Sequence, residues 1–184
     1  MIGTHDSFTY LKPVNPIYSL FNFLWRTQSL SLKKQLNKGV KYFDIRVSYY
    51  KSKWRVSHGL VNFDLTFSSI KYILEIFAPY YVRLILEKGN DKVEELFTDA
   101  ISEVAQYPNL SFACIKKGWK VLVNRDPVIK DYSYIPWYSG YSFLWNLKHF
   151  KLSSIKYYAK KHNPSITKEM IEDPYTVYFM DYVE

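Results

Sequence analysis

The chain has 184 residues, enough for one domain with a sizeable hydrophobic core, and no apolar run in it is long enough to span a bilayer as a helix. Its single cysteine, Cys114, excludes an internal disulfide and gives no indication of redox chemistry. A formal charge of +8 favours anionic partners. An aromatic content of 19% suits membrane interfaces and stacking surfaces, because aromatic rings are amphipathic.

The first half of the chain predicts a short N-terminal segment, one helix and a strand pair. Pro13 and Pro16 mark a loop after residues 2–10, and apolar periodicity predicts a helix over 17–36. Residues 40–50 (VKYFDIRVSYY) are rich in β-branched and aromatic side chains, which predicts a strand, and residues 53–61 are expected to pair with it across a short turn.

The second half alternates helices and strands. Periodicity and composition predict helices over 67–77, 91–106, 155–161 and 166–171, and strands over 82–86, 110–115, 120–123 and 175–182. This alternation predicts an α/β fold with a mostly parallel sheet, for which we favour a TIM-type (β/α) barrel. Because such barrels usually take about 250 residues, this one is expected to be small, irregular or incomplete on one side.

Residues 131–146 (DYSYIPWYSGYSFLWN) have neither a helical nor a strand period and are predicted to form a long loop. Two interpretations of its aromatic residues stay open. The rings can cover the barrel, as large rings often do. Alternatively they dip into a lipid interface, with basic side chains nearby for anionic headgroups; the residues concerned are Trp137, Tyr138, Phe143, Trp145, Lys148, Lys151 and Lys156.

Three short motifs carry the chemistry: GTHDS at 3–7, FDIR at 43–46 and VSHG at 56–59. Each places polar groups at a predicted strand end, and in parallel α/β folds such ends converge on one face. Two imidazoles, several carboxylates and a guanidinium suit phosphodiester cleavage. The attack on phosphorus needs a base for the nucleophile, an acid for the leaving alkoxide and positive charge for the phosphoryl oxygens.

In their order and spacing, these motifs resemble the X region of phosphatidylinositol-specific phospholipase C, in particular its bacterial form. The resemblance spans about the first half of the chain. It implies that His5 is the general base acting on the inositol 2-hydroxyl, that His58 protonates the leaving diacylglycerol oxygen, and that the reaction passes through a cyclic phosphate. It further implies that Arg46 stabilises the phosphate.

The resemblance also implies supporting roles for four more residues. Asp6 supports the acid or anchors Arg46, Asp44 helps to orient Arg46, and Asp181 near the C-terminus orients the base. Arg125 matches a family arginine that contacts the inositol ring.

No metal is expected in the site. The eukaryotic relatives bind calcium with acidic side chains around the first histidine, and Arg46 occupies one of those positions. Its fixed positive charge would repel a dication, which predicts metal-independent catalysis. Glu87 lies where the calcium-dependent relatives have an acid and the bacterial ones a lysine. It is assigned to substrate binding, and headgroup specificity and a residual calcium role stay open.

Three alternatives to this enzyme remain open. One is a glycerophosphodiester-cleaving enzyme, and another is an inactive phosphoinositide- or membrane-binding module. A nucleic-acid binder ranks last because the lysines are scattered rather than clustered. We therefore expect a phospholipid or other phosphodiester substrate, a peripheral membrane surface as partner and no nucleic acid. One domain over residues 1–184 is expected to be cytoplasmic, or secreted after loss of a leader, because no signal peptide is visible.

Overall fold

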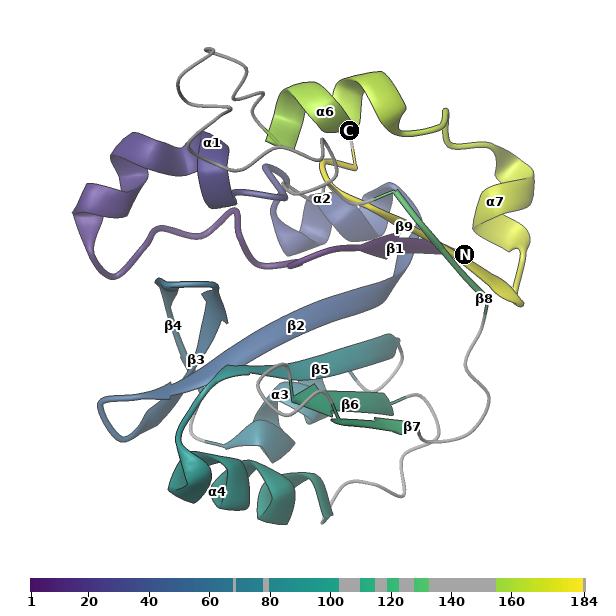
Figure 1. The fold of residues 1–184 in the computed structure, drawn as a ribbon. Coiled ribbons are helices and arrows are strands. Elements are labelled where there is room, and N and C mark those ends of the chain that lie inside the picture. The colour runs from purple at the N-terminus through teal and green to yellow at the C-terminus, as the bar shows by residue number, and fades with distance from the viewer. Residues whose placement is uncertain are drawn as a thin grey trace.

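The computed structural model describes residues 1–67, 69–77, 80–102, 110–114, 119–122, 128–132 and 155–183. Nine strands form one sheet in the order β7-β6-β5-β2-β1-β9-β8, with β3 on β2 and β4 on β3 (Figure 1). The strands are β1 (Ile2–Thr4), β2 (Val40–Tyr50), β3 (Lys53–His58), β4 (Val61–Phe67), β5 (Tyr81–Lys88), β6 (Leu110–Cys114), β7 (Trp119–Leu122), β8 (Val128–Asp131) and β9 (Thr176–Met180).

The sheet is mostly parallel, as predicted. Strands β8, β9, β1, β2, β5 and β6 run parallel to their neighbours, whereas β3, β4 and β7 join by antiparallel pairing. Among the described strands, β7 and β8 at the two ends do not pair with each other. The fold is therefore an α/β barrel that is incomplete on one side, which confirms the predicted class.

Short helices cover the outside of the sheet (Figure 1). They are the 3₁₀ helix η1 (Pro16–Phe21) and the α-helices α1 (Asn22–Trp25), α2 (Leu32–Asn37), α3 (Ile70–Phe77), α4 (Asp91–Ser102), α6 (Ile155–His162) and α7 (Lys168–Glu172). In Figure 1, α1, α6 and α7 lie on the side of β1 and β9, and α4 lies beyond β5 and β6 on the opposite side. Among the described helices, none has the length and hydropathy needed for a transmembrane span.

One face of strand β2 packs in the hydrophobic core, and the other faces the interior of the barrel. Because side chains alternate along a strand, Phe43 and Ile45 share one face and Asp44 and Arg46 share the other. Phe43 is fully buried and packs against Phe77 of α3 with ring centroids 5.4 Å apart. The apolar face thus packs under the helices, and the polar face is left for a site.

The predicted helix over 17–36 is wrong in its middle. The chain turns extended at Arg26, the C-cap residue of α1, and re-enters a helix only at α2. The cause is tertiary: the buried side chains of Thr27 and Gln28 donate hydrogen bonds to the carbonyls of His5 (2.9 Å) and Met180 (2.9 Å). These hydrogen bonds, made to residues at the ends of β1 and β9, outweigh the local helix propensity. The spacing of apolar residues in the sequence gives no indication of them.

Two further predictions need correction. Residues 61–67 form β4 rather than entering a helix at Phe67, because the alternating VNFDLTF buries Val61, Phe63 and Phe67 on one side; α3 begins at Ile70. Strand β8 was missed, and it contains the first residue of the predicted loop over 131–146, most of which lies outside the described residues. The remaining predicted strands and helices are confirmed within a few residues at their ends. Residues 103–106 of the helix at 91–106, and residues 115 and 123 at the ends of two predicted strands, also lie outside the described part.

Candidate active site

The site begins where β1 and β9 end side by side. These parallel strands pair Thr4 with Met180, so the next residues, His5 and Asp181, emerge together. The Nδ1–H of His5 donates a hydrogen bond to Oδ1 of Asp181 at 2.9 Å. Because a carboxylate is only an acceptor, this bond keeps the proton of a neutral His5 on Nδ1 and leaves Nε2 to face the site.

Strand β2 brings the arginine to the same place. Thr4 at the end of β1 lies opposite Phe43, and β2 continues past it with Asp44 and Arg46 on its inward face. Arg46 Nε lies 2.7 Å from Oδ1 of Asp6 and 3.4 Å from Oδ2 of Asp44, and Nη2 contacts Nε2 of His5. The guanidinium is thereby oriented by two carboxylates beside the first imidazole.

His58 reaches the site on a hairpin, as the predicted pairing of residues 53–61 with 40–50 across a short turn implies. It ends β3, which runs back antiparallel to β2. Its Nδ1–H donates to the Trp25 carbonyl at 2.7 Å, and its Nε2 lies 3.2 Å from Oδ2 of Asp6. The ring centroids of His5 and His58 are 6.1 Å apart, so both Nε2 atoms border one small space.

Asp6 links the two histidines and the arginine of the site. Its side chain is 1% exposed, and one oxygen or the other lies within 3.4 Å of His5, Arg46 and His58. Its backbone is in the left-handed region at φ 45°, a conformation that aspartate tolerates better than most residues. Burial opposes the charge, but Arg46 and the two histidines outweigh it and lower the pKa of Asp6. Asp6 is therefore an anion.

The pKa of His5 is raised to about 9. Burial works against the imidazolium, but the charge of Asp6 and the hydrogen bond and charge of Asp181 more than compensate, while Arg46 opposes protonation. In the free protein His5 is thus a stronger base than an ordinary imidazole. Near neutral pH, a phosphodiester that reaches His5 is therefore surrounded by both positive and negative side chains.

Glu87 near the end of β5 completes the cluster. Its Oε2 lies 3.4 Å from Nη1 of Arg46, and its Oε1 accepts the N–H of Gly59 at 2.9 Å. Burial raises the pKa of Glu87, Arg46 acts in the opposite sense, and Asp6 adds to the increase.

Seven of the eight residues predicted from the sequence meet in this cluster: His5, Asp6, Asp44, Arg46, His58, Glu87 and Asp181. Arg125 lies outside the described residues. Sequence reasoning missed Trp25, because its contribution is a backbone carbonyl that any residue type can supply. It also missed Thr27 and Gln28, whose only signal is that two polar residues interrupt an apolar periodicity.

Three residues of the cluster offer atoms that a cation could bind. Oxygen and nitrogen atoms of His5, Asp6 and Asp44 lie within 4.8 Å of one another, and Oδ1 of Asp44 is buried without a hydrogen bond. Arg46, however, places its guanidinium against all three residues, 2.7 Å from Asp6, 3.4 Å from Asp44 and in contact with Nε2 of His5. A dication here would face a fixed positive charge at contact distance, so the donor set does not fit one.

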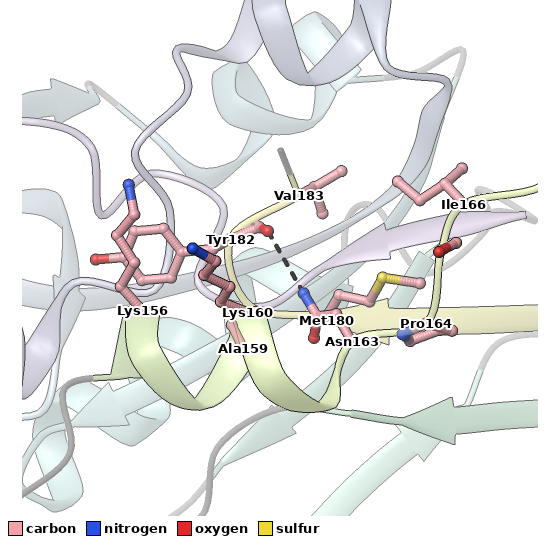
Figure 2. Close-up of a pocket in the computed structure, with 10 residues that line it drawn as sticks. Lys156, Ala159, Lys160, Asn163, Pro164, Ile166, Met180, Tyr182 and Val183 are labelled. Carbon is pink, nitrogen blue, oxygen red and sulfur yellow. Dashed lines mark hydrogen bonds between the residues drawn. The ribbon is translucent and has the colours of Figure 1, made fainter.

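A cavity of about 230 Å³ lies between α6 and the end of the chain and is lined by Met180 and Tyr182, the two neighbours of Asp181 in the sequence (Figure 2). On its wall, Nδ2 of Asn163 donates hydrogen bonds to the carbonyls of Asp181 (2.6 Å) and Tyr182 (3.4 Å). Tyr182 has a left-handed backbone with φ 45°. Asn163 thus ties the backbone after β9 in the conformation that aims the Asp181 carboxylate at His5.

Comparisons with known proteins agree with the motifs. No protein-family model matches the chain. Over 89 residues, or 42% of this chain, it is 36% identical to a PI-PLC X-box domain-containing protein of Dictyostelium discoideum, and the match spans 11% of that protein's length.

Two solved bacterial structures share the fold. The phosphatidylinositol-specific phospholipase C of Listeria monocytogenes superposes with a TM-score of 0.64 at 17% identity, covering 100% of this chain and 88% of that one. The enzyme of the same name from Staphylococcus aureus superposes with a TM-score of 0.53 at 17% identity, covering 99% and 85%. The resemblance to the phosphatidylinositol-specific phospholipase C X-domain family, first drawn from three short motifs, is confirmed by a sequence match and by the fold.

Proposed function

We propose that this protein is a phosphodiesterase of the phospholipase C type that cleaves phosphatidylinositol-like phosphodiesters without a metal ion. The observation that carries the proposal is the pair of imidazoles with ring centroids 6.1 Å apart. Each ring is held through Nδ1, by Asp181 or by the Trp25 carbonyl, so that Nε2 faces the space beside Arg46. Two oriented imidazoles and a guanidinium are the groups that an in-line displacement at phosphorus needs.

In the proposed reaction, His5 takes the proton of the inositol 2-hydroxyl as its oxygen bonds to phosphorus. The bond from phosphorus to the diacylglycerol oxygen breaks, and His58 gives that oxygen a proton from Nε2. The products are a cyclic inositol phosphate and diacylglycerol. Asp181 stabilises the imidazolium of His5, and Asp6 holds the Nε2 proton of His58 until it is transferred.

Arg46 replaces the metal in this proposal. The guanidinium is oriented by Asp6 and Asp44, which frees part of its donor fork for the phosphoryl oxygens. Burial works against its charge, but the carboxylates of Asp6, Asp44 and Glu87 outweigh burial and raise the pKa of Arg46, so it stays charged at every working pH.

The surface beside the site supports a lipid substrate in a membrane. Five apolar side chains within η1 and α1 are at least 39% exposed: Ile17, Leu20, Phe21, Phe23 and Leu24. The segment ends at Trp25, whose carbonyl holds His58. Helix α6, which contacts α1, carries Lys160 and Lys161 in its last turn. Exposed apolar residues beside lysines suit peripheral binding to an anionic bilayer. The aromatic loop predicted for this role, and Arg125 as a ligand of the inositol ring, lie outside the described residues.

The test is release of water-soluble inositol phosphate from phosphatidylinositol vesicles, with either EDTA or calcium present. We expect activity that EDTA leaves intact, a cyclic phosphate as first product, and a loss of at least 10²-fold in each of His5→Ala and His58→Ala. Asp64→Asn, an exposed change outside the site, is the control.

Other outcomes contradict the proposal. Activity that disappears with EDTA and returns with calcium indicates a metal enzyme. A wild-type protein that binds the vesicles without cleaving any lipid indicates the inactive binding module, and cleavage of glycerophosphodiesters alone indicates a different substrate class.

A further inference from the structure

The turn that carries His58 is held from outside its own hairpin. Gly59 follows His58 with a left-handed backbone at φ 54°, and both of its polar backbone groups bind side chains of β5. Its N–H donates to Oε1 of Glu87 at 2.9 Å, and its carbonyl accepts from Nζ of Lys88 at 3.1 Å. Two consecutive residues of one strand thus grip the amide and the carbonyl of a single residue.

Consecutive side chains of a regular strand point to opposite faces, so this grip needs an irregularity. The register of β2 and β5 supplies it: Val47 pairs with Leu86 and Ser48 pairs with Lys88, which leaves Glu87 unpaired in a bulge. Bulges re-aim side chains and are frequent beside active sites. Here the bulge lets both Glu87 and Lys88 reach Gly59.

The two ends of the hairpin are held by different neighbours. Strand β4 is attached to the segment before η1 through backbone hydrogen bonds with Lys12 and Val14, whereas the turn at Gly59 contacts β5 through Glu87 and Lys88. The His58 ring is 19% exposed, and its polar contacts are the Trp25 carbonyl and Asp6. A shift of the turn moves His58, and displacing a proton donor by about 1 Å is enough to cost two orders of magnitude in rate.

We propose that Glu87 and Lys88 act as a clamp on the Gly59 backbone that positions His58 as the general acid. The inference rests on the proposed function, in which His58 protonates the leaving alkoxide. Glu87 and Lys88 are positioning residues in this scheme. What matters in Glu87 is its hydrogen-bond acceptor toward Gly59, more than its charge toward the substrate.

Four variants separate these roles. Glu87→Gln keeps an acceptor and removes the charge, Glu87→Ala removes both, and Lys88→Met keeps the aliphatic stem and removes the donor. Glu95→Ala on α4, which is exposed and outside the site, is the control. Each is assayed on phosphatidylinositol and on an inositol phosphodiester with a 4-nitrophenyl leaving group, whose low pKa makes protonation by an acid unnecessary.

The clamp predicts a pattern across the two substrates. Glu87→Ala is expected to lose about 30-fold in kcat on phosphatidylinositol and about threefold or less on the nitrophenyl ester, since only the step that uses His58 suffers. Glu87→Gln is expected to lose about tenfold less than Glu87→Ala, and Lys88→Met to show the same substrate bias. Equal losses on both substrates, or equal losses in Glu87→Gln and Glu87→Ala, overturn the clamp.

Hydrogen exchange at the Gly59 amide tests the clamp without relying on turnover. Glu87→Ala is expected to speed exchange at Gly59 at least tenfold, while Glu87→Gln stays within threefold of the wild type. Unchanged exchange in Glu87→Ala refutes the clamp even in an active enzyme. If the wild type is inactive on both substrates but exchange follows the expected order, the proposed function fails and the grip on Gly59 stands as a structural fact.

Discussion

The carboxylates of this site act by orienting and charging their neighbours. Asp181 fixes the tautomer of His5, and Asp6 contacts His5, His58 and Arg46. Such a network raises the proton affinity of His5 and lowers that of Asp6. One carboxylate therefore contacts the proposed base, the proposed acid and the proposed phosphate-binding group together.

The hydrogen bond between Asp181 and His5 predicts how the rate depends on pH. As a general base His5 must be neutral, so kcat/KM of the wild type is expected to rise with pH until about 9. Asp181→Asn removes a carboxylate that favours the imidazolium. The pKa of His5 then falls, the midpoint of the rise moves to lower pH, and kcat drops by about a hundredfold. A pH–rate profile with Asp64→Asn as control checks this; an unmoved midpoint contradicts the role of Asp181.

At the scale of elements, strand ends and one hairpin assemble the site. Parallel pairing of β1 with β9 aligns His5 with Asp181, and β2 passes the end of β1 to present Arg46. The hairpin of β2, β3 and β4 then folds His58 back toward the same place. The motif order predicted this meeting, and the predicted strand pair over 40–50 and 53–61 is the hairpin that carries His58.

Close contact between β1 and β9 depends on Gly3. A Cβ at this position would lie 2.7 Å from Cγ1 of Val177 and 3.0 Å from Cδ2 of Phe179, both on β9. Gly3→Ala is therefore expected to push β9 away, to lower the free energy of unfolding by about 1–3 kcal/mol and to weaken the bond between His5 and Asp181.

Urea denaturation and vesicle assays on Gly3→Ala measure both effects. Ser31→Ala is the control, because Ser31 caps α2 without a side-chain hydrogen bond. If Gly3→Ala keeps wild-type stability and activity, β1 and β9 can accommodate a methyl group between them and the prediction is wrong.

For the molecule as a whole, the site is a source of pH-dependent stability. The pKa of His5 is about 9 in the folded protein against an ordinary value of 6.5. A raised pKa stabilises the fold fully below pH 6.5, and this contribution is lost as the pH rises through 9. The loss is at most about 3 kcal/mol.

Urea unfolding of the wild type and of His5→Gln between pH 6 and pH 10 isolates this contribution. We expect the difference in unfolding free energy between the two proteins to shrink as the pH rises across that range. A constant difference would mean that His5 does not titrate near 9 in the folded protein.

Several predictions from the sequence stay predictions at this scale. They are one domain over residues 1–184, the cellular location and the absence of a metal requirement. The membrane role of the aromatic loop and the contact of Arg125 with substrate also remain predictions, because they fall outside the described residues.

The sequence by itself determined the α/β class, most strands and helices, the hairpin that carries His58 and five residues of the cluster, because periodicity and the GTHDS, FDIR and SHG motifs are local properties of the chain. Glu87 and Asp181 followed from the family resemblance. Only the tertiary structure decided that the helix breaks at Arg26 and that Glu87 sits in a bulge against Gly59. Each of these features depends on contacts with backbone groups of distant segments. Every residue type has the same backbone amide and carbonyl, so the sequence does not show which of these groups is contacted.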